Sequence, residues 1–208
     1  MRAIKSIFTT CFALSVVVVF STNKYVIARI ITNNNDTIVN LVKQTPLHEM
    51  QNQIEVKVND SITNILYPLD AKSFYTIAGK GDTIRFESNC GLKFGMADKI
   101  EDNCYFMMKL ISDKIPLYYF SVKKLMSLGV FMQQVEQPAY FSKYFDDWII
   151  MEENNYVNQI EKLIKPYKRN VNPDKMKLLR KLETDLYYRV YKFEDIPDFF
   201  KKLNTILK

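Results

Sequence analysis

The single histidine is the first residue that could carry chemistry. His48 opens the stretch His48-Glu49-Met50-Gln51-Asn52, which begins like the His-Glu-x-x-His helix of zinc proteases. Position 52 is Asn, so the second imidazole that the metal needs one helical turn later is missing. A Ser-His-Asp triad would need the same histidine, and the sequence has no Gly-x-Ser-x-Gly turn to present a serine nucleophile. We therefore predict an exposed loop histidine without a catalytic role.

Carboxylate pairs are the next candidates, because two acids at a suitable separation perform general acid and base catalysis. Asp146-Asp147 and Glu152-Glu153 are adjacent in sequence, so in a strand the two side chains of each pair point to opposite faces and cannot share a proton. A turn and a solvated strand end explain both pairs. Distant acids such as Asp36 and Asp70 could converge only through the fold, which leaves an enzyme of that kind as an alternative.

Neither a metal nor a cofactor is expected. Asn33-Asn34-Asn35-Asp36 offers oxygen ligands but lacks the spacing and the closing Glu of a calcium loop. A turn explains this cluster, since Asn and Asp tolerate left-handed backbone angles. Gly79-Lys80-Gly81 is too short to cradle a phosphate, and no helix follows it. We predict no catalytic, cofactor-binding or metal-binding residue.

The charge of the chain is concentrated near its end. The net charge is +6, and residues 161–208 hold 13 Lys and Arg against 7 Asp and Glu. Basic residues interleaved with tyrosines are compatible with nucleic acid or with an anionic membrane, whereas solvated faces of docked helices are the simpler explanation. The candidates for contact with an anionic surface are Lys168, Arg169, Lys177, Arg180 and Lys181.

The first residues have the layout of a secretory signal. Arg2 and Lys5 precede an apolar run over residues 7–20, and the next charge is Lys24. Eighteen uncharged residues would span about 27 Å as a helix, just short of a hydrocarbon core of roughly 30 Å. We expect residues 1–21 to be a cleaved signal peptide and the protein to be exported to the periplasm, the outer envelope or the exterior. An N-terminal membrane anchor is the alternative, and nucleic acid is not an expected partner.

Export would decide the chemistry of the cysteines. Removal of the signal takes Cys11 away and leaves Cys90 and Cys104, an even pair in an oxidising compartment. A disulfide between them would close a loop of about 15 residues and stabilise the fold by about 3 kcal/mol. Two buried thiols are the alternative.

Two segments must position these residues. Residues 22–152 predict a β-rich body, because Gln53-Ile54-Glu55-Val56-Lys57-Val58 alternates with period two and turn clusters separate other short apolar runs. Residues 123–136 are ambiguous, since their leucines also fit a helix. Residues 153–208 predict three amphipathic helices that pack on the body. The fold class is therefore α+β: an antiparallel meander, as an open barrel or curled sheet, with C-terminal helices.

Two stretches of the body also occur together elsewhere. Ile30-Ile31-Thr32-Asn33-Asn34-Asn35-Asp36-Thr37-Ile38 is followed by Tyr67-Pro68-Leu69-Asp70-Ala71-Lys72-Ser73-Phe74. This pair resembles landmarks of a broad family of uncharacterised exported proteins of Gram-negative bacteria, although its second element is one residue tighter. Asn35 and Asn40 also stand where glycine is common. The resemblance covers residues 25–90 and, faintly, 191–196, and it implies a β-rich exported module with no known activity.

These observations favour a non-enzymatic binding or structural module of the cell envelope. Its partner would be a protein or another envelope component. The alternatives are an envelope enzyme whose acids converge only in the fold, and a protein that contacts an anionic membrane peripherally through its basic helices.

Overall fold

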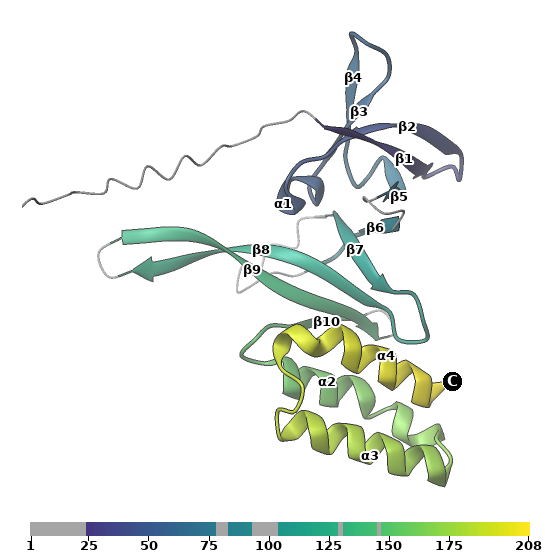
Figure 1. The fold of residues 1–208 in the computed structure, drawn as a ribbon, viewed down its shortest axis with the longest axis vertical. Helices are drawn as coiled ribbons and strands as arrows, with labels where there is room; N and C mark the ends of the chain where they lie inside the picture. Colours follow the sequence, from purple (N-terminus) through teal and green to yellow (C-terminus); the bar gives the residue numbers. More distant parts are fainter. Residues whose placement is uncertain (1–23, 78–82, 93–103, 129–130, 145–146) are drawn as a thin grey trace, which may run out of the picture.

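The computed structural model describes residues 24–77, 83–92, 104–128, 131–144 and 147–208 (Figure 1). The expected signal peptide with Cys11, the turn Gly79-Lys80-Gly81-Asp82 and Asp146 lie outside these ranges. Within them, ten strands form a single antiparallel sheet that is followed by helices. This arrangement confirms the α+β class, with an open sheet rather than a closed barrel.

The sheet consists of two meanders joined side by side. Its strands are β1 (Tyr25–Thr32), β2 (Thr37–Lys43), β3 (Ile54–Lys57), β4 (Thr63–Leu66), β5 (Ala71–Ile77), β6 (Thr83–Asn89), β7 (Tyr105–Ile111), β8 (Leu117–Leu128), β9 (Phe131–Tyr144) and β10 (Asp147–Met151). Their order is β10-β9-β8-β7-β6-β5-β1-β2-β3-β4. Only β5 breaks the sequential order, because it returns to pair with β1.

The segment that the sequence left ambiguous, residues 123–136, is strand. β8 and β9 form the longest hairpin of the sheet, and their pairing runs from Tyr118 opposite Phe141 to Leu128 opposite Phe131. Lys123 lies opposite Glu136 in this register. The helical spacing of the leucines is thus overridden by pairing with a partner strand along the hairpin.

Helices cover one face of the sheet at each end (Figure 1). The short helix α1 (Leu47–Met50) packs near one end, where Phe74 stacks on Phe86 with ring centroids 4.5 Å apart. Helices α2 (Tyr156–Ile164) and α4 (Ile196–Leu207) pack on the sheet at the other end, against β10 and β7, and α3 (Pro173–Tyr187) packs on α2 and α4 on their side away from the sheet. The apolar stripes of the three helices share one core with buried residues of β7 to β10. Two short 3-10 turns, η2 (Tyr167–Asn170) and η3 (Phe193–Asp195), connect these three helices.

The expected helix signals act as predicted on α3. The Asn172 side chain caps the helix by accepting a hydrogen bond from the backbone N–H of Lys175 at 2.9 Å, and Pro173 occupies the first turn. Among the described residues, none of the helices combines the length and the apolar character needed to cross a bilayer.

The two stretches that carry the family resemblance contact each other. Asn33 donates a side-chain hydrogen bond to the carbonyl of Leu69, and Lys72 Nζ donates to Asn35 Oδ1 at 2.7 Å. Asn35 adopts a left-handed backbone with φ of 68°, which Asn tolerates better than most residues. The turn residues therefore hold the β1–β2 hairpin against the turn that leads into β5.

Candidate functional site

Helices α2 and α3 lie beside each other and enclose a broad open groove of about 1110 Å³. We call it the basic groove. Its cations are Lys162 of α2, Lys165 at the C-cap of α2, Lys168 of η2 and Arg180 of α3, and its acids are Glu161 and Glu183. Tyr187 and Tyr188 close one end.

Helical spacing brings these side chains to one face. Lys162 and Lys165 are three residues apart on α2, and Arg180, Glu183 and Tyr187 repeat at intervals of three and four on α3. Residues at these intervals share a helix face. Each helix buries its apolar stripe against the core, so the polar residues that flank the stripes line the space between the helices.

The basic groove has more cations than it can neutralise itself. Lys168 Nζ lies 2.5 Å from Glu183 Oε1, which pairs these two charges. Lys162, Lys165 and Arg180 have no ion-pair partner among the residues that the structure describes. Four cations face two carboxylates, so the groove carries a net positive potential. Such a potential attracts anions over about one Debye length in salt.

Only some of the basic residues that the sequence analysis named line the groove. Lys168 and Arg180 line it, whereas Arg169, Lys177 and Lys181 are exposed and lie outside its lining. Lys162 was not among the candidates, which were taken from basic residues further along the chain. Spacing alone would not have excluded Lys177, since it lies three residues before Arg180 and shares its helix face.

Two exposed tyrosines stand at the end of the basic groove. Tyr187 and Tyr188 are 68% and 73% exposed, and their rings contact edge to face with centroids 5.4 Å apart. Aromatic side chains with a polar tip favour an interface between an apolar phase and water, because the ring contacts the apolar side and the hydroxyl stays hydrated. The groove therefore combines unpaired cations with amphipathic rings.

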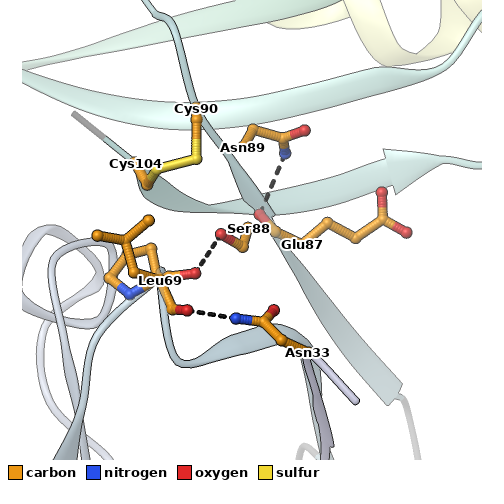
Figure 2. The surroundings of a disulfide bond; sticks show 8 residues. Asn33, Leu69, Glu87, Ser88, Asn89, Cys90 and Cys104 are labelled. Atoms are coloured by element: carbon orange, nitrogen blue, oxygen red, sulfur yellow. Dashed lines mark hydrogen bonds between the residues drawn. A yellow bond between two sulfur atoms is a disulfide. The ribbon is translucent and has the colours of Figure 1, made fainter. Parts of the chain in front are cut away.

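Two of the three cysteines are bonded to each other. Cys90 and Cys104 form a disulfide with Cα atoms 4.0 Å apart, and it joins the end of β6 to the start of β7 (Figure 2). Ser88 donates a hydrogen bond to the carbonyl of Pro68 next to this bond, and Asn33 bonds to Leu69 in the same turn. The disulfide thus lies beside the turn cluster at one edge of the fold.

The acids do not converge on a site among the described residues. Glu87 is the centre of an ion cluster: its carboxylate lies 2.5 Å from Arg85 Nη2, 3.1 Å from Lys109 Nζ and 2.8 Å from the Tyr118 hydroxyl, which donates to it. Burial and this hydrogen bond raise the pKa of Tyr118 well above its ordinary value. No second carboxylate joins the cluster, and no group of acids, histidines or cysteines in the described residues could hold a metal ion.

The other candidate acids serve local structure. The Asp70 carboxylate accepts the backbone N–H of Tyr67 at 2.7 Å and closes its own turn. Asp36 is exposed in the β1–β2 turn, and Asp147 is exposed at the start of β10. Glu152 follows β10, where its backbone N–H donates to the Asn155 side chain at 2.8 Å. These positions give the enzyme alternative no support.

The prediction for His48 is wrong in one respect: the side chain is not in an exposed loop. His48 belongs to α1, is 22% exposed, and its Nδ1 lies 2.6 Å from Glu136 Oε1 of β9. Ser121 of β8 donates to the other Glu136 oxygen at 3.2 Å. The acid lies between serine and imidazole, so the imidazole cannot take the serine proton as in a hydrolase triad. The three residues instead fasten α1 to the β8–β9 hairpin.

Comparisons with known proteins give no relative for this fold: no family model, no curated protein and no solved structure matches the chain. The resemblance to the exported family stays a prediction. The arrangement of the side chains is therefore the basis for a functional proposal, and within the described residues the basic groove combines three cations without an ion-pair partner.

Proposed function

We propose that the protein is an exported, non-enzymatic binding module that attaches to an anionic membrane surface through the basic groove. The observation that carries the proposal is the set of three groove cations, Lys162, Lys165 and Arg180, that have no ion-pair partner among the described residues. They lie on two helices that a shared apolar core holds together. The backbone segments that carry these three cations are therefore held in fixed positions relative to each other.

The magnitude of the interaction fits a reversible peripheral contact. Each Lys or Arg near an anionic membrane contributes about 1 kcal/mol, so three cations supply roughly 3 kcal/mol before the tyrosines are counted. Tyr187 and Tyr188 would lie at headgroup level, where amphipathic rings are favoured. Binding of this kind weakens as salt increases, because the Debye length shrinks from about 10 Å at 0.1 M to about 3 Å at 1 M.

Two features support export. Residues 1–21 have the charge and hydropathy layout of a signal peptide. Cys90 and Cys104 are paired in a disulfide, and such bonds persist mainly in oxidising compartments. An exported protein meets anionic lipid at the envelope rather than nucleic acid. N-terminal sequencing of the protein from the envelope fraction tests this part: a start near Thr22 supports export with cleavage, and intact chain in the cytoplasm contradicts it.

Vesicle binding tests the groove itself. The chain is sedimented with vesicles of phosphatidylglycerol and with vesicles of neutral phosphatidylcholine. We expect binding to the anionic vesicles alone, weakened at least about tenfold by Lys162→Glu with Lys165→Glu, since about 1 kcal/mol is lost for each lysine.

A matched control keeps the net charge equal. Lys24→Glu with Lys143→Glu makes the same charge change, but Lys143 lies on β9 beside Trp148 and neither residue lines the groove. This control should bind nearly as the unchanged protein does. Equal losses in both double variants would mean that only total charge matters. Binding to an oligonucleotide without binding to vesicles would also overturn the proposal.

A further inference from the structure

A second surface lies on the sheet, away from the basic groove. Ile27 and Arg29 alternate along β1 with the buried Ala28 and Ile30, so they point to the face opposite the α1 core. On that face β1, β2, β5 and β6 form a trough of about 540 Å³. We call it the sheet trough. Its lining includes Ile27, Arg29, Ile31, Val39, Tyr75 and Thr83.

The apolar lining is unusually exposed. Val39 is 62% exposed and Ile27 is 57% exposed. Exposed apolar side chains that lie together in a concave surface are typical of ligand-binding grooves. The volume lies within the roughly 300 to 1,000 Å³ of small-molecule sites, which are mostly apolar with a few placed polar groups. The trough has this composition.

One cation stands in the middle of the trough. Arg29 lies between Val39 on β2 and Tyr75 on β5 in the sheet register. It has no ion-pair partner among the residues that the structure describes. The neighbouring cation Arg85 differs, because its guanidinium lies 5.1 Å from the centre of the Tyr75 ring and pairs with Glu87. Arg29 is therefore the cation in the trough that is available to a ligand.

The residues that line the sheet trough favour one class of ligand over others. A sugar would need hydrogen-bonding groups along its whole length, and the exposed aliphatic side chains of Ile27 and Val39 offer it none, although Thr37, Tyr75 and Thr83 also line the trough. A polyanion would need several free cations, and the trough has Arg29. A molecule with one negative charge and an apolar body matches both features, because a guanidinium binds a carboxylate through two parallel hydrogen bonds. An acyl chain would cover Ile27 and Val39.

We propose that the sheet trough binds a free long-chain carboxylate, with Arg29 holding the carboxylate and Ile27, Ile31 and Val39 contacting the chain. This site is separate from the basic groove and does not depend on membrane attachment. The occupant is a single fatty acid anion rather than a bilayer, since the trough has the volume of a small-molecule site, about 540 Å³.

Calorimetric titration of the full chain with decanoate, decanol and decylamine tests the proposal. We expect saturable binding of decanoate to one site, weaker binding of decanol and none of decylamine. Arg29→Met keeps an unbranched, flexible side chain and removes its charge. It should weaken decanoate binding at least about tenfold, the usual effect of losing a charged hydrogen bond, while decanol binding is unchanged. Arg29→Lys should restore part of the affinity.

Two controls keep the result interpretable. Arg169→Met makes the same substitution at an exposed site in η2 and should leave decanoate binding unchanged. Val39→Asp places a second negative charge in the trough and should abolish decanoate binding. Both Arg29 and Val39 are exposed, so the variants should unfold at the temperature of the unchanged protein.

The proposal fails if decanoate does not bind, or if Arg29→Met binds it as tightly as the unchanged protein does. It also fails if an acidic peptide saturates the trough and decanoate does not. Vesicle binding by Arg29→Met separates the two proposals. It should remain normal, because the variant leaves the basic groove intact.

Discussion

The side-chain amide of Asn204 bonds to both backbone groups of Ile115. Its Oδ1 accepts the Ile115 N–H at 2.8 Å, and its Nδ2 donates to the Ile115 carbonyl at 2.9 Å. Asn204 is 1% exposed on α4, and Ile115 is fully buried between β7 and β8. One side chain thus pairs with the strand connection as a neighbouring strand would, and it fastens α4 to the sheet.

Asn204→Leu should therefore destabilise the protein more than its similar volume suggests. The substitution leaves the buried N–H and C=O of Ile115 without partners, at a cost of about 2 to 4 kcal/mol in the free energy of unfolding. The midpoint of thermal unfolding should fall by roughly 5 to 15 °C. Asn170→Leu, at an exposed asparagine of η2, should shift it little. Equal midpoints for the two variants would contradict the role given to Asn204.

The disulfide predicts a second stability difference. Cys90→Ser with Cys104→Ser opens a loop whose ends are 14 residues apart, so the free energy of unfolding should fall by about 3 kcal/mol. Urea denaturation at pH 7 measures this change. The unchanged protein treated with a reductant should lose a similar amount. A double variant as stable as the oxidised protein would show that the bond does not stabilise the fold.

The end of α3 contains a residue under backbone strain. Arg189 has φ of 54°, and the hydrogen bonds from its own N–H to Leu186 and from Val190 to Asp185 form the paired bonds of a helix C-terminal motif. Glycine is favoured at this position, because a Cβ costs about 1 kcal/mol in left-handed backbone. Arg189→Gly should raise the free energy of unfolding by about 1 kcal/mol, as measured in urea. Arg189→Ala keeps the Cβ and should give no such gain, so equal effects would refute the strain.

Tyr118 predicts how stability depends on pH. Burial, followed by its hydrogen bond to Glu87, holds the pKa of the folded-state phenol above the ordinary 10.0 of the unfolded chain. The folded protein then binds more protons than the unfolded chain above pH 10, so stability falls as pH rises beyond that value. Tyr118→Phe removes this contribution. The free energy of unfolding of this variant should therefore fall less steeply as the pH rises above 10.

Urea denaturation at pH 8 and near pH 11 measures that difference. Tyr187→Phe, at a phenol that is 68% exposed, provides the matched control and should retain the slope of the unchanged protein. Identical slopes for Tyr118→Phe and Tyr187→Phe would show that the buried phenol does not contribute to the pH dependence.

Local patterns in the sequence predicted the elements well. The alternation of Gln53 to Val58 predicted the strand that the structure shows as β3, and Asn172 with Pro173 predicted the start of α3. Such signals depend on neighbours a few residues apart. Residues 123–136 show the limit, because their leucines fit either period and a partner strand decided between them.

The sites depend on distant contacts and could be predicted only in part. The basic region was apparent from composition, but its groove depends on how α2 and α3 face each other, so Lys162 was missed and Lys181 was included. The sheet trough was not predictable, because β5 leaves the sequential order to pair with β1 and so places Tyr75 beside Arg29. His48 was misplaced for the same reason, since Glu136 lies 88 positions later in the chain.

Lysine footprinting tests the central claim most directly. The chain is treated with an amine-acylating reagent alone, with phosphatidylglycerol vesicles and with phosphatidylcholine vesicles, and the modification of each lysine is measured by mass spectrometry. Contact through the basic groove predicts that anionic vesicles protect Lys162 and Lys165 severalfold and leave Lys143 as reactive as before, while neutral vesicles protect none of the three. Equal reactivity of Lys162 and Lys165 with and without anionic vesicles, or stronger protection of Lys143, would contradict the account.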